Sequence, residues 1–475
     1  MNRIVRRLHS DESGVGLVEV LLAMLVFAIV AVSVAYSVTL TLTNTRDSKA
    51  RQMALNLAAS DIDAVRAIGD PFEVHSSSTP VTSNGETFTV QRTTSWVSEG
   101  GGDADCSASG GTLRYKRVNV TVTWTGMGPT GIPARTDTIL APASRINDPS
   151  KGTVFVSVKG ADGLGEEDVS FTVSPNPGAG VVVEPTDVEG CSFLLGVTPG
   201  TYTVTLGKAG YIDFAQATNP TRTGVVTAGG STAFAFQYDR QSSFPVRYAS
   251  NALRLPSQTP PVPAQKIEYP AELSTTYVNA NGVWNVASPV TEAGNANAPA
   301  LGTGTAARSL HPYPAGYQAF AGPYADTTCE VHDPEAWAPD TTATPPAIGL
   351  RAPAQGAAPG GTAPNLDVPM GVVDIRQAAS SSNRYVVAVR QSSPAAPGQP
   401  ACSGTLEYRF GEILPNNKTG AARMALPFGT WRIYAATSSY GGRVVLPAAS
   451  VTLLTKGVVP DANGSLILDP RGVQP

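Results

Sequence analysis

With 475 residues, the chain is too long for one compact core, so several modules are expected. Its 33 Lys and Arg residues nearly balance its 37 Asp and Glu residues, so no basic surface points to nucleic acid as a partner. Gly (47) and Pro (39) are abundant and only 15% of residues are charged, which favours short strands and turns over long soluble helices.

The N-terminus combines a polar leader with a long apolar stretch. Residues 1–14, MNRIVRRLHSDESG, carry Arg3, Arg6 and Arg7, whereas residues 20–42 carry no charged side chain. As a helix with a rise of about 1.5 Å per residue, the apolar stretch is long enough to cross a bilayer core of about 30 Å. The basic end is expected to stay in the cytoplasm, which predicts a single-pass inner (cytoplasmic) membrane protein.

The helical pattern continues beyond the apolar stretch. Proline is absent before Pro71 and glycine is absent between Gly16 and Gly69, where a stop signal follows. We expect one helix over residues 15–69, with its first half in lipid and its second half packed on a soluble sheet. The packing face at helical spacing consists of Ala54, Leu57, Ala58, Ile62, Val65 and Ile68, and Asp61 lies at its edge.

Glu19 is an acid inside the apolar stretch. A carboxylate there costs about 2.5–3.5 kcal/mol on insertion scales, so a partner is expected. The stretch GVGLVEVLLAMLVFAIV resembles the N-terminal signature of type IV prepilins and type II secretion pseudopilins, in which a basic leader ends in glycine and the fifth mature residue is glutamate. Gly14 matches the residue before the cut, Val15 the first mature residue and Glu19 the glutamate.

This resemblance implies both processing and assembly. A membrane prepilin peptidase would cut between Gly14 and Val15, and the new amine of Val15 would be methylated. Because a free α-amine is cationic at neutral pH, Glu19 of one subunit can pair with Val15 of its neighbour in a filament core. A buried pair of this kind specifies the register of subunits more than it stabilises them.

Two other interpretations of the N-terminus stay open. A secretory signal peptide also has a basic start and an apolar centre, and Ser33-Val34-Ala35 offers small residues for cleavage. Its apolar region would, however, be longer than the usual length of about 7–15 residues and would contain an acid. A plain, uncleaved transmembrane anchor is the second alternative, with Glu19 near the interface.

Strand patterns begin after Pro71. Residues 86–98 and 114–126 alternate between apolar and polar side chains, and residues 136–142 form a third run. These runs predict a small antiparallel sheet within residues 70–147 that packs on the helix, the arrangement expected of a pilin. The predicted fold class is therefore a long α-helix, transmembrane and then amphipathic, a pilin-like antiparallel sheet, and all-β sandwich modules after it.

Four more segments complete the expected domain organisation. Residues 150–240 resemble transthyretin-like or carboxypeptidase-regulatory-like β-sandwich modules, with a Pro-Gly turn ahead of an alternating run. Residues 366–475 are interpreted as a second, diverged sandwich, because RMALPFGTWRIYAATS repeats the proline, glycine, threonine, aromatic order of VTPGTYTVTL. Between them, residues 241–333 read as a further β module, and residues 334–365, rich in Pro, Ala and Gly, as an extended linker.

A search for chemistry finds no catalytic or metal-binding motif. The four histidines lack the spacing of HExxH, and GxSxG, Walker and GxGxxG motifs are absent, so we expect no enzyme activity and no cofactor or metal. The four cysteines also lack zinc-motif spacing. If the chain is exported, two disulfides are expected among three connectivities, with Cys329 paired to Cys402.

Together these features predict a minor pilin or pseudopilin. Cut by prepilin peptidase, it would join other pilin or pseudopilin subunits at low copy, near the tip of a type IV pilus-like or type II secretion-like filament. About 330 residues follow the pilin sheet and would crowd every subunit of a bulk filament. The outer β modules would lie at the cell surface, facing a surface or host ligand. The alternative is a surface adhesin or binding protein held by an uncleaved membrane anchor.

Overall fold

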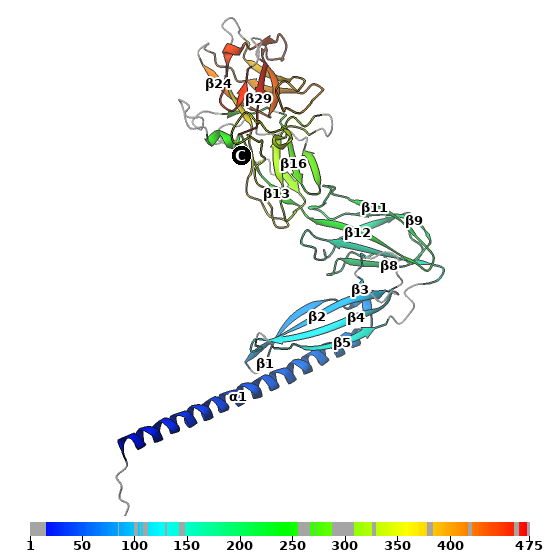
Figure 1. Cartoon of the computed structure of the whole chain (residues 1–475). Helices are drawn as coiled ribbons and strands as arrows, with labels where there is room; N and C mark the ends of the chain where they lie inside the picture. The colour runs from blue at the N-terminus through cyan, green and yellow to red at the C-terminus, as the bar shows by residue number, and fades with distance from the viewer. Residues whose placement is uncertain are drawn as a thin grey trace, which may run out of the picture.

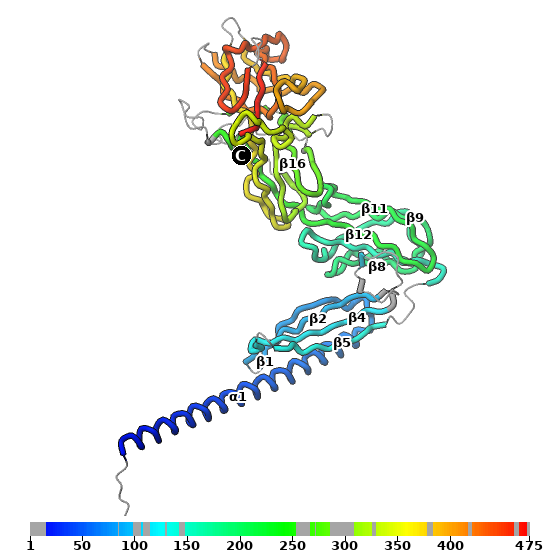
Figure 2. The backbone as a smooth tube through the Cα atoms, viewed as in Figure 1, coloured from blue at the N-terminus to red at the C-terminus, as the bar shows by residue number. Residues whose placement is uncertain are grey.

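The computed structural model describes residues 16–83, 85–98, 103–104, 106–107, 113–128, 131–141, 148–254, 267–270, 272–286, 308–324, 329–377, 383–416, 420–459 and 465–472. Helix α1 (Leu17–Ile68) protrudes as a rod, and the β-sheets follow one another away from its free end (Figure 1). The tube in Figure 2 shows the chain passing through residues 77–140, then residues 152–240 and then residues 242–472, where segments distant in sequence lie together. The predicted fold class, a long apolar helix followed by antiparallel sheets and sandwiches, is confirmed.

Three units surround separate cores. The head comprises the C-terminal half of α1 with strands β1 to β5, the sandwich spans residues 150–240, and the C-terminal body spans residues 242–472. The head strands are β1 (Ser77–Ser83), β2 (Glu86–Ser98), β3 (Asp103–Ala104), β4 (Leu113–Trp124) and β5 (Ala134–Leu140).

The head is an antiparallel sheet packed on one face of α1. Its strand order is β1-β2-β4-β5, with β3 paired to β2. Small alanines on the helix allow a close approach to a valine-rich sheet face. The buried helix residues are Ala50, Ala54, Ala58, Ile62 and Val65, and they share a core with Phe88, Val90, Val118, Val120 and Val122. The helix ends at Gly69, whose left-handed φ of 77° favours glycine.

Two residues and one strand at the margin of the head refine the expected packing. Asp61, at the edge of the apolar face, accepts two hydrogen bonds from the guanidinium of Arg92 on β2, one of them 2.9 Å long from Nε. Ile68 was expected on the packing face but is 46% exposed, because it is the last residue of the helix. The sequence of strand β1, SSTPVTS, lacks the apolar–polar alternation that predicts a strand, because the strand is largely exposed at the edge of the sheet. An edge strand also tolerates Pro80.

The sandwich packs two sheets face to face. One sheet has the order β10-β12-β6-β8 and the other the order β11-β9-β7, and β6 and β12 run parallel. Valine, leucine and aromatic side chains from both sheets fill the space between them. The strands are β6 (Gly152–Lys159), β7 (Phe171–Ser174), β8 (Cys191–Val197), β9 (Gly200–Leu206), β10 (Tyr211–Asp213), β11 (Thr221–Val226) and β12 (Ser231–Arg240).

A covalent and aromatic joint connects the head to the sandwich. Cys106 of the head forms a disulfide with Cys191 at the start of β8. Beside it, Phe72 and Trp96 of the head pack against Phe193 of the sandwich, with ring centroids 5.0 and 5.8 Å from that of Phe193. The disulfide therefore sits within a small apolar cluster of its own.

The C-terminal body is one unit, not a series of modules. A single core extends from Phe244 to Leu468. Strand β14 pairs in parallel with β20, and β15 pairs in parallel with β24, so segments more than a hundred residues apart share sheets. Residues 241–333 and 366–475, expected as separate modules, are therefore parts of the same domain. The expectation failed because local strand patterns carry no information about distant partners.

The larger sheets of this body have the orders β23-β22-β25-β29-β28, β15-β24-β21-β27 and β17-β16-β19. The strands are β13 (Ser242–Phe244), β14 (Val246–Tyr248), β15 (Ile267–Glu268), β16 (Thr275–Asn279), β17 (Gly282–Val286), β18 (Arg308–Leu310), β19 (Gln318–Ala321), β20 (Leu366–Val368), β21 (Gly371–Arg376), β22 (Tyr385–Arg390), β23 (Glu407–Glu412), β24 (Ala421–Leu426), β25 (Gly429–Ala436), β26 (Val444–Val445), β27 (Val451–Leu453), β28 (Gly457–Val458) and β29 (Ser465–Leu468). Short 3-10 helices occur at η2 (Pro71–Glu73), η3 (Ser250–Arg254), η6 (Pro334–Ala336) and η7 (Ala448–Ser450).

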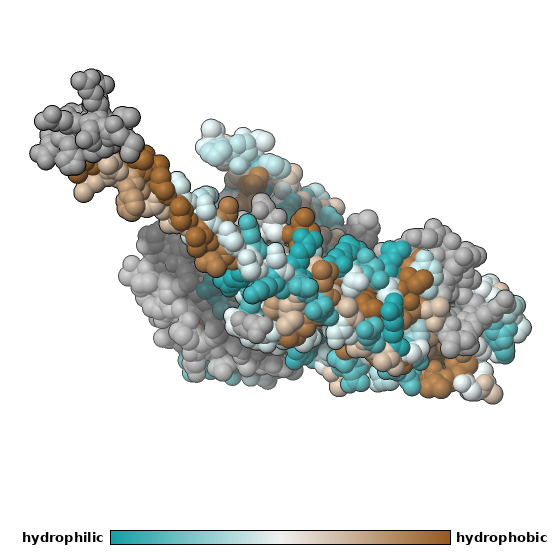
Figure 3. Space-filling model, turned by 90° about the horizontal axis from the view of Figure 1, so that it is seen from below, coloured by the Kyte–Doolittle hydropathy of each residue, from teal (hydrophilic) through white to brown (hydrophobic). Residues whose placement is uncertain are grey.

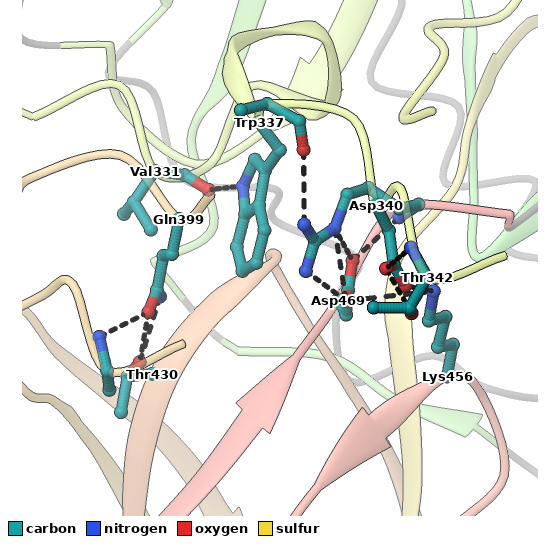
Figure 4. Close-up of polar contacts among 11 residues, drawn as sticks. Val331, Trp337, Asp340, Thr342, Gln399, Thr430, Lys456 and Asp469 are labelled. Carbon is teal, nitrogen blue, oxygen red and sulfur yellow. Dashed lines mark hydrogen bonds and ion pairs between the residues drawn. The ribbon is translucent and has the colours of Figure 1, made fainter. Parts of the chain in front are cut away.

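Residues 334–365 are folded into this body, which corrects the expectation of an extended linker. Trp337 is 3% exposed, and its indole N–H donates to the Val331 carbonyl at 2.9 Å (Figure 4). The guanidinium of Arg471, from the end of the chain, lies 5.4 Å from the Trp337 ring and donates to the Ala338 carbonyl. A Pro-rich segment restricts the backbone, but packing with distant residues decides whether it is a linker.

Burial keeps two histidines of the C-terminal body neutral. One ring nitrogen of His332, Nδ1, lies 2.7 Å from the Phe428 carbonyl, and the other, Nε2, lies 3.1 Å from the guanidinium of Arg390. Burial lowers the pKa of His332 to about 3. Burial also lowers the pKa of His311 to about 4, near the contact between the body and the sandwich residue Gln216.

Replacing Ile62 by alanine should loosen the head. Ile62 is 5% exposed in the helix–sheet core, and truncation of such a residue costs about 2–5 kcal/mol. We expect hydrogen exchange of the β2 and β4 amides in the full-length protein in detergent to accelerate by an amount equivalent to that loss. Leu55→Ala is the matched control, because Leu55 is 46% exposed on the same helix. Equal effects of the two variants would contradict packing through this face.

Lowering the pH from about 7 to about 5 should destabilise the C-terminal body. The folded-state pKa values of His332 and His311 lie below the ordinary value of 6.5, so the unfolded chain takes up protons first as the pH falls. The stability from the neutral rings is complete above about pH 6.5 and decreases below it by up to about 1.4 kcal/mol per pH unit for each ring. Calorimetry of thermal unfolding between these pH values measures this loss.

His332→Gln is the comparison variant for the pH prediction, because glutamine does not titrate. Its unfolding temperature should depend less steeply on pH below about 6.5 than that of the parent. An identical pH dependence in parent and variant would contradict a contribution from His332.

Candidate functional site

The N-terminal half of α1 is bare. Every side chain of residues 17–49 is exposed, and large apolar side chains occur all round the helix up to Leu42. The hydrophobic residues stand out along the protruding rod in Figure 3. Among the described residues, α1 is the one helix long and apolar enough to span a membrane. A helix that is apolar on all sides requires an apolar environment, in lipid or among other helices.

Glu19 lies in the first turn of this bare half. The helix begins after Gly16, whose carbonyl accepts hydrogen bonds from the backbone N–H groups of Glu19 (2.8 Å) and Val20 (3.2 Å). No side chain caps the helix at Gly16. A carboxylate near free N–H groups at a helix start is favoured by the helix dipole. The exposed carboxylate of Glu19 forms no ion pair with any residue in the described part of the chain, so it is available to a partner.

Gly14 and Val15, the residues of the expected cleavage, lie outside the described residues. Gly16 follows them directly and has an extended backbone (φ −68°, ψ 142°), so α1 starts two residues after the expected cut. Residues 33–35, the alternative cleavage segment, lie within the continuous helix.

Six serine and threonine side chains of the bare half form hydrogen bonds within the helix. Each of these hydroxyls donates to the backbone carbonyl four residues earlier, at 2.8–2.9 Å. Such bonds remove the cost of placing a hydroxyl where water is absent. The residues are Ser33, Ser37, Thr39, Thr41, Thr43 and Thr45. These six hydroxyls are therefore suited to a dry environment.

An ion pair marks the point where the bare half meets the head. The guanidinium of Arg46 lies 3.5 Å from Glu86 at the start of β2, and Glu86 also accepts the Gly126 N–H at 3.1 Å. A groove of about 410 Å³ adjoins the pair, bordered by Leu42 and Phe88. No sequence pattern singles out Glu86. Arg46, the first charged residue after the apolar stretch, was the available signal, because long cations commonly mark the edge of an apolar surface.

The cysteines lie together in two pairs. Cys106 is bonded to Cys191 between head and sandwich, and Cys329 is bonded to Cys402 within the C-terminal body. The second pair is the one named from the sequence. None of the four cysteines is free.

Comparison with known proteins gives little beyond distant likeness. No protein-family model and no curated protein sequence matches the chain. Solved structures that align with it include the Bacillus anthracis TIE protein (12% identity, 81% of this chain, 71% of that chain, TM-score 0.19). Others are a streptococcal ancillary pilin (9%, 53%, 75%, 0.19) and the major pilin subunit of Bacillus cereus (11%, 62%, 92%, 0.17). TM-scores this low do not indicate a shared fold, so no role is assigned from these structures.

Proposed function

We propose that the protein is a prepilin-like minor pilin or pseudopilin. It is first held in the inner membrane by α1, is processed by a prepilin peptidase, and then enters a type IV pilus-like or type II secretion-like filament at low copy. The β units are carried outside the cell. The role is structural and involves no catalytic step.

The bare apolar half of α1, continuous with its packed half, is the observation that carries this proposal. Residues 17–42 would span about 39 Å at 1.5 Å per residue, enough for a hydrocarbon core of about 30 Å. A contiguous apolar surface of this size is not tolerated in water, so it must be covered by lipid before assembly and by other helices afterwards. The head, attached to the same helix, keeps the remaining units outside that apolar layer.

Glu19 supports assembly in particular. Its carboxylate is exposed at the free end of the rod, where a partner from another subunit has access. Cleavage after Gly14 would release the amine of Val15, which is a cation at neutral pH. In the filament, the Val15 amine of an adjacent subunit would lie near Glu19. Pairing of the two would offset the cost of a carboxylate among apolar helices and would fix the axial register.

The low copy number of this subunit in the filament is inferred from the size of its β units. The sandwich and the C-terminal body together add more than 300 residues to the head, and each would have to fit around a filament built on closely packed helices. Incorporation at or near a tip avoids this crowding and exposes the C-terminal body to a surface or host ligand. A surface adhesin on an uncleaved anchor is the second candidate, because the same bare helix can remain in the membrane.

The mature N-terminus distinguishes these candidates. Intact-mass measurement and N-terminal sequencing of protein recovered from the cell surface should find Val15 first, carrying a methyl group. A chain that starts at Met1 would identify the uncleaved anchor, and one that starts at Tyr36 would identify a secretory signal peptide. Either of those results would rule out prepilin processing.

Replacing Glu19 by valine should abolish assembly without harming insertion. The variant removes a charge from lipid, so its level in the membrane should equal or exceed that of the parent. Cleavage after Gly14 should persist, because the cut bond lies upstream of Glu19. Incorporation into filaments, measured by immunoblotting of sheared fractions, should fall by at least about tenfold, which corresponds to about 1.4 kcal/mol of lost pairing.

Val20→Leu is the matched control for Glu19→Val, because it changes an adjacent apolar side chain and leaves the charge in place. It should assemble as the parent does. Normal incorporation of Glu19→Val would remove the assembly role, and loss of its membrane insertion would mean that the anchor itself needs the acid.

A further inference from the structure

A cluster of potential metal ligands lies at the joint between head and sandwich. His75 belongs to the head, between η2 and β1, whereas Asp187 and Glu189 belong to the sandwich, just before β8. One donor atom from each of the three side chains lies within 4.8 Å of the other two. The disulfide between Cys106 and Cys191 is close by, since Cys191 follows Glu189 by two residues.

The distance between His75 and Asp187 suits a shared metal ion better than a hydrogen bond. His75 Nδ1 and Asp187 Oδ2 are 3.6 Å apart, which exceeds the usual hydrogen-bond range of about 2.7–3.2 Å. Two ligands of a tetrahedral zinc ion, each at about 2.1 Å from the metal, lie about 3.4 Å apart. His75 Nδ1 is also buried and has no hydrogen-bond partner among the described residues. Its lone pair is therefore available to an ion.

The surrounding structure orients both carboxylates. Asp187 Oδ1 accepts the backbone N–H groups of Glu189 and Cys191, each at 2.9 Å, which leaves Oδ2 directed toward His75. Glu189 Oε1 accepts the backbone N–H of Ser76 at 2.8 Å and the hydroxyl of Thr94. Hydrogen bonds of this kind, which fix the direction of a ligand, are a regular feature of protein metal sites.

The net charge of the cluster also favours binding of a cation. Lys116, 1% exposed, lies 3.5 Å from Glu189 Oε2 and is the one cation paired with either carboxylate among the described residues. A neutral imidazole, two carboxylates and one ammonium sum to one excess negative charge. A divalent ion would convert this excess into a net positive charge shared among four side chains. Removing the ion leaves two partly buried carboxylates with a single counter-charge.

We propose that His75, Asp187 and Glu189 bind one divalent ion of the zinc type, with water as a further ligand. An imidazole nitrogen combined with carboxylate oxygens favours Zn²⁺ over Ca²⁺, which takes oxygen ligands alone. Because the histidine and the carboxylates come from different units, the ion fastens the head to the sandwich beside the disulfide. This site is independent of the proposed role of α1.

Zinc titration of the untagged, full-length protein in detergent tests the site. The protein is stripped with a chelator, dialysed and titrated with ZnCl₂ in a calorimeter. We expect one ion per chain, and X-ray absorption of the loaded protein should show nitrogen and oxygen ligands including one imidazole, without sulfur. Hydrogen exchange at residues 72–76 and 187–191 should slow when zinc is bound, because binding to the folded joint stabilises it.

Two variants and one control make the assignment specific. His75→Ala removes the nitrogen ligand, and Asp187→Asn removes a charge while keeping an acceptor for the two backbone N–H groups. Each should weaken zinc binding by more than about tenfold, since even partners of ligands change metal affinity by about 10- to 100-fold. Asp63→Asn, an exposed carboxylate on α1, should bind zinc as the parent does.

The proposal is overturned if the parent takes up no zinc at a ratio of one per chain. It is also overturned if both His75→Ala and Asp187→Asn bind zinc as tightly as the parent, or if the absorption spectrum lacks an imidazole. Non-reducing mass analysis of the Cys106–Cys191 peptide and far-ultraviolet circular dichroism establish that each variant is folded, so weak binding by a variant is not mistaken for unfolding.

Discussion

The hydrogen-bonded backbone of α1 runs without a break from Leu17 to Ile68, so the bare apolar half and the half packed in the head form one rigid element. Proline and glycine, the usual causes of a kink, are absent between its ends. Whatever surrounds the bare half therefore also fixes the direction of the head. The close helix–sheet contact through alanines transmits that direction to β4 and β5, and the Arg46–Glu86 pair adds a polar contact where the environment changes.

The two joints beyond the head differ in their chemistry. Head and sandwich are joined by a disulfide set among aromatic rings, which resists both separation and wetting. Sandwich and C-terminal body meet through polar groups: Gln216 accepts the backbone N–H of His311 and donates to the Tyr317 hydroxyl, each at 3.0 Å. Because hydrogen bonds exchange with water more readily than a disulfide breaks, the second joint is the weaker of the two.

The parts that sequence predicted are those determined by local patterns. Helix α1 was predictable because only Gly and Pro positions and apolar spacing were needed, and both lie within about seventy residues. The folded state of residues 334–365 was not predictable, since Trp337 depends on Arg471 at the other end of the body. The candidate assembly residue Glu19 was evident from a single misplaced charge, whereas Glu86 is recognised only through its contact with Arg46.

The same limit explains why a motif search finds no metal site although His75 lies beside two carboxylates. More than a hundred residues separate His75 from Asp187, and such motifs rely on ligands a few residues apart. What distinguishes His75 from His332 is the charge of its neighbours: His332 faces a carbonyl and a guanidinium, which leave no place for a cation, whereas His75 faces Asp187. The disulfide, the aromatic contacts of Phe193 and the hydrogen bonds of Glu189 already connect the head to the sandwich. A metal ion at His75 would add a further bond on a different segment of the head from Cys106 and help carry the direction of α1 into the sandwich.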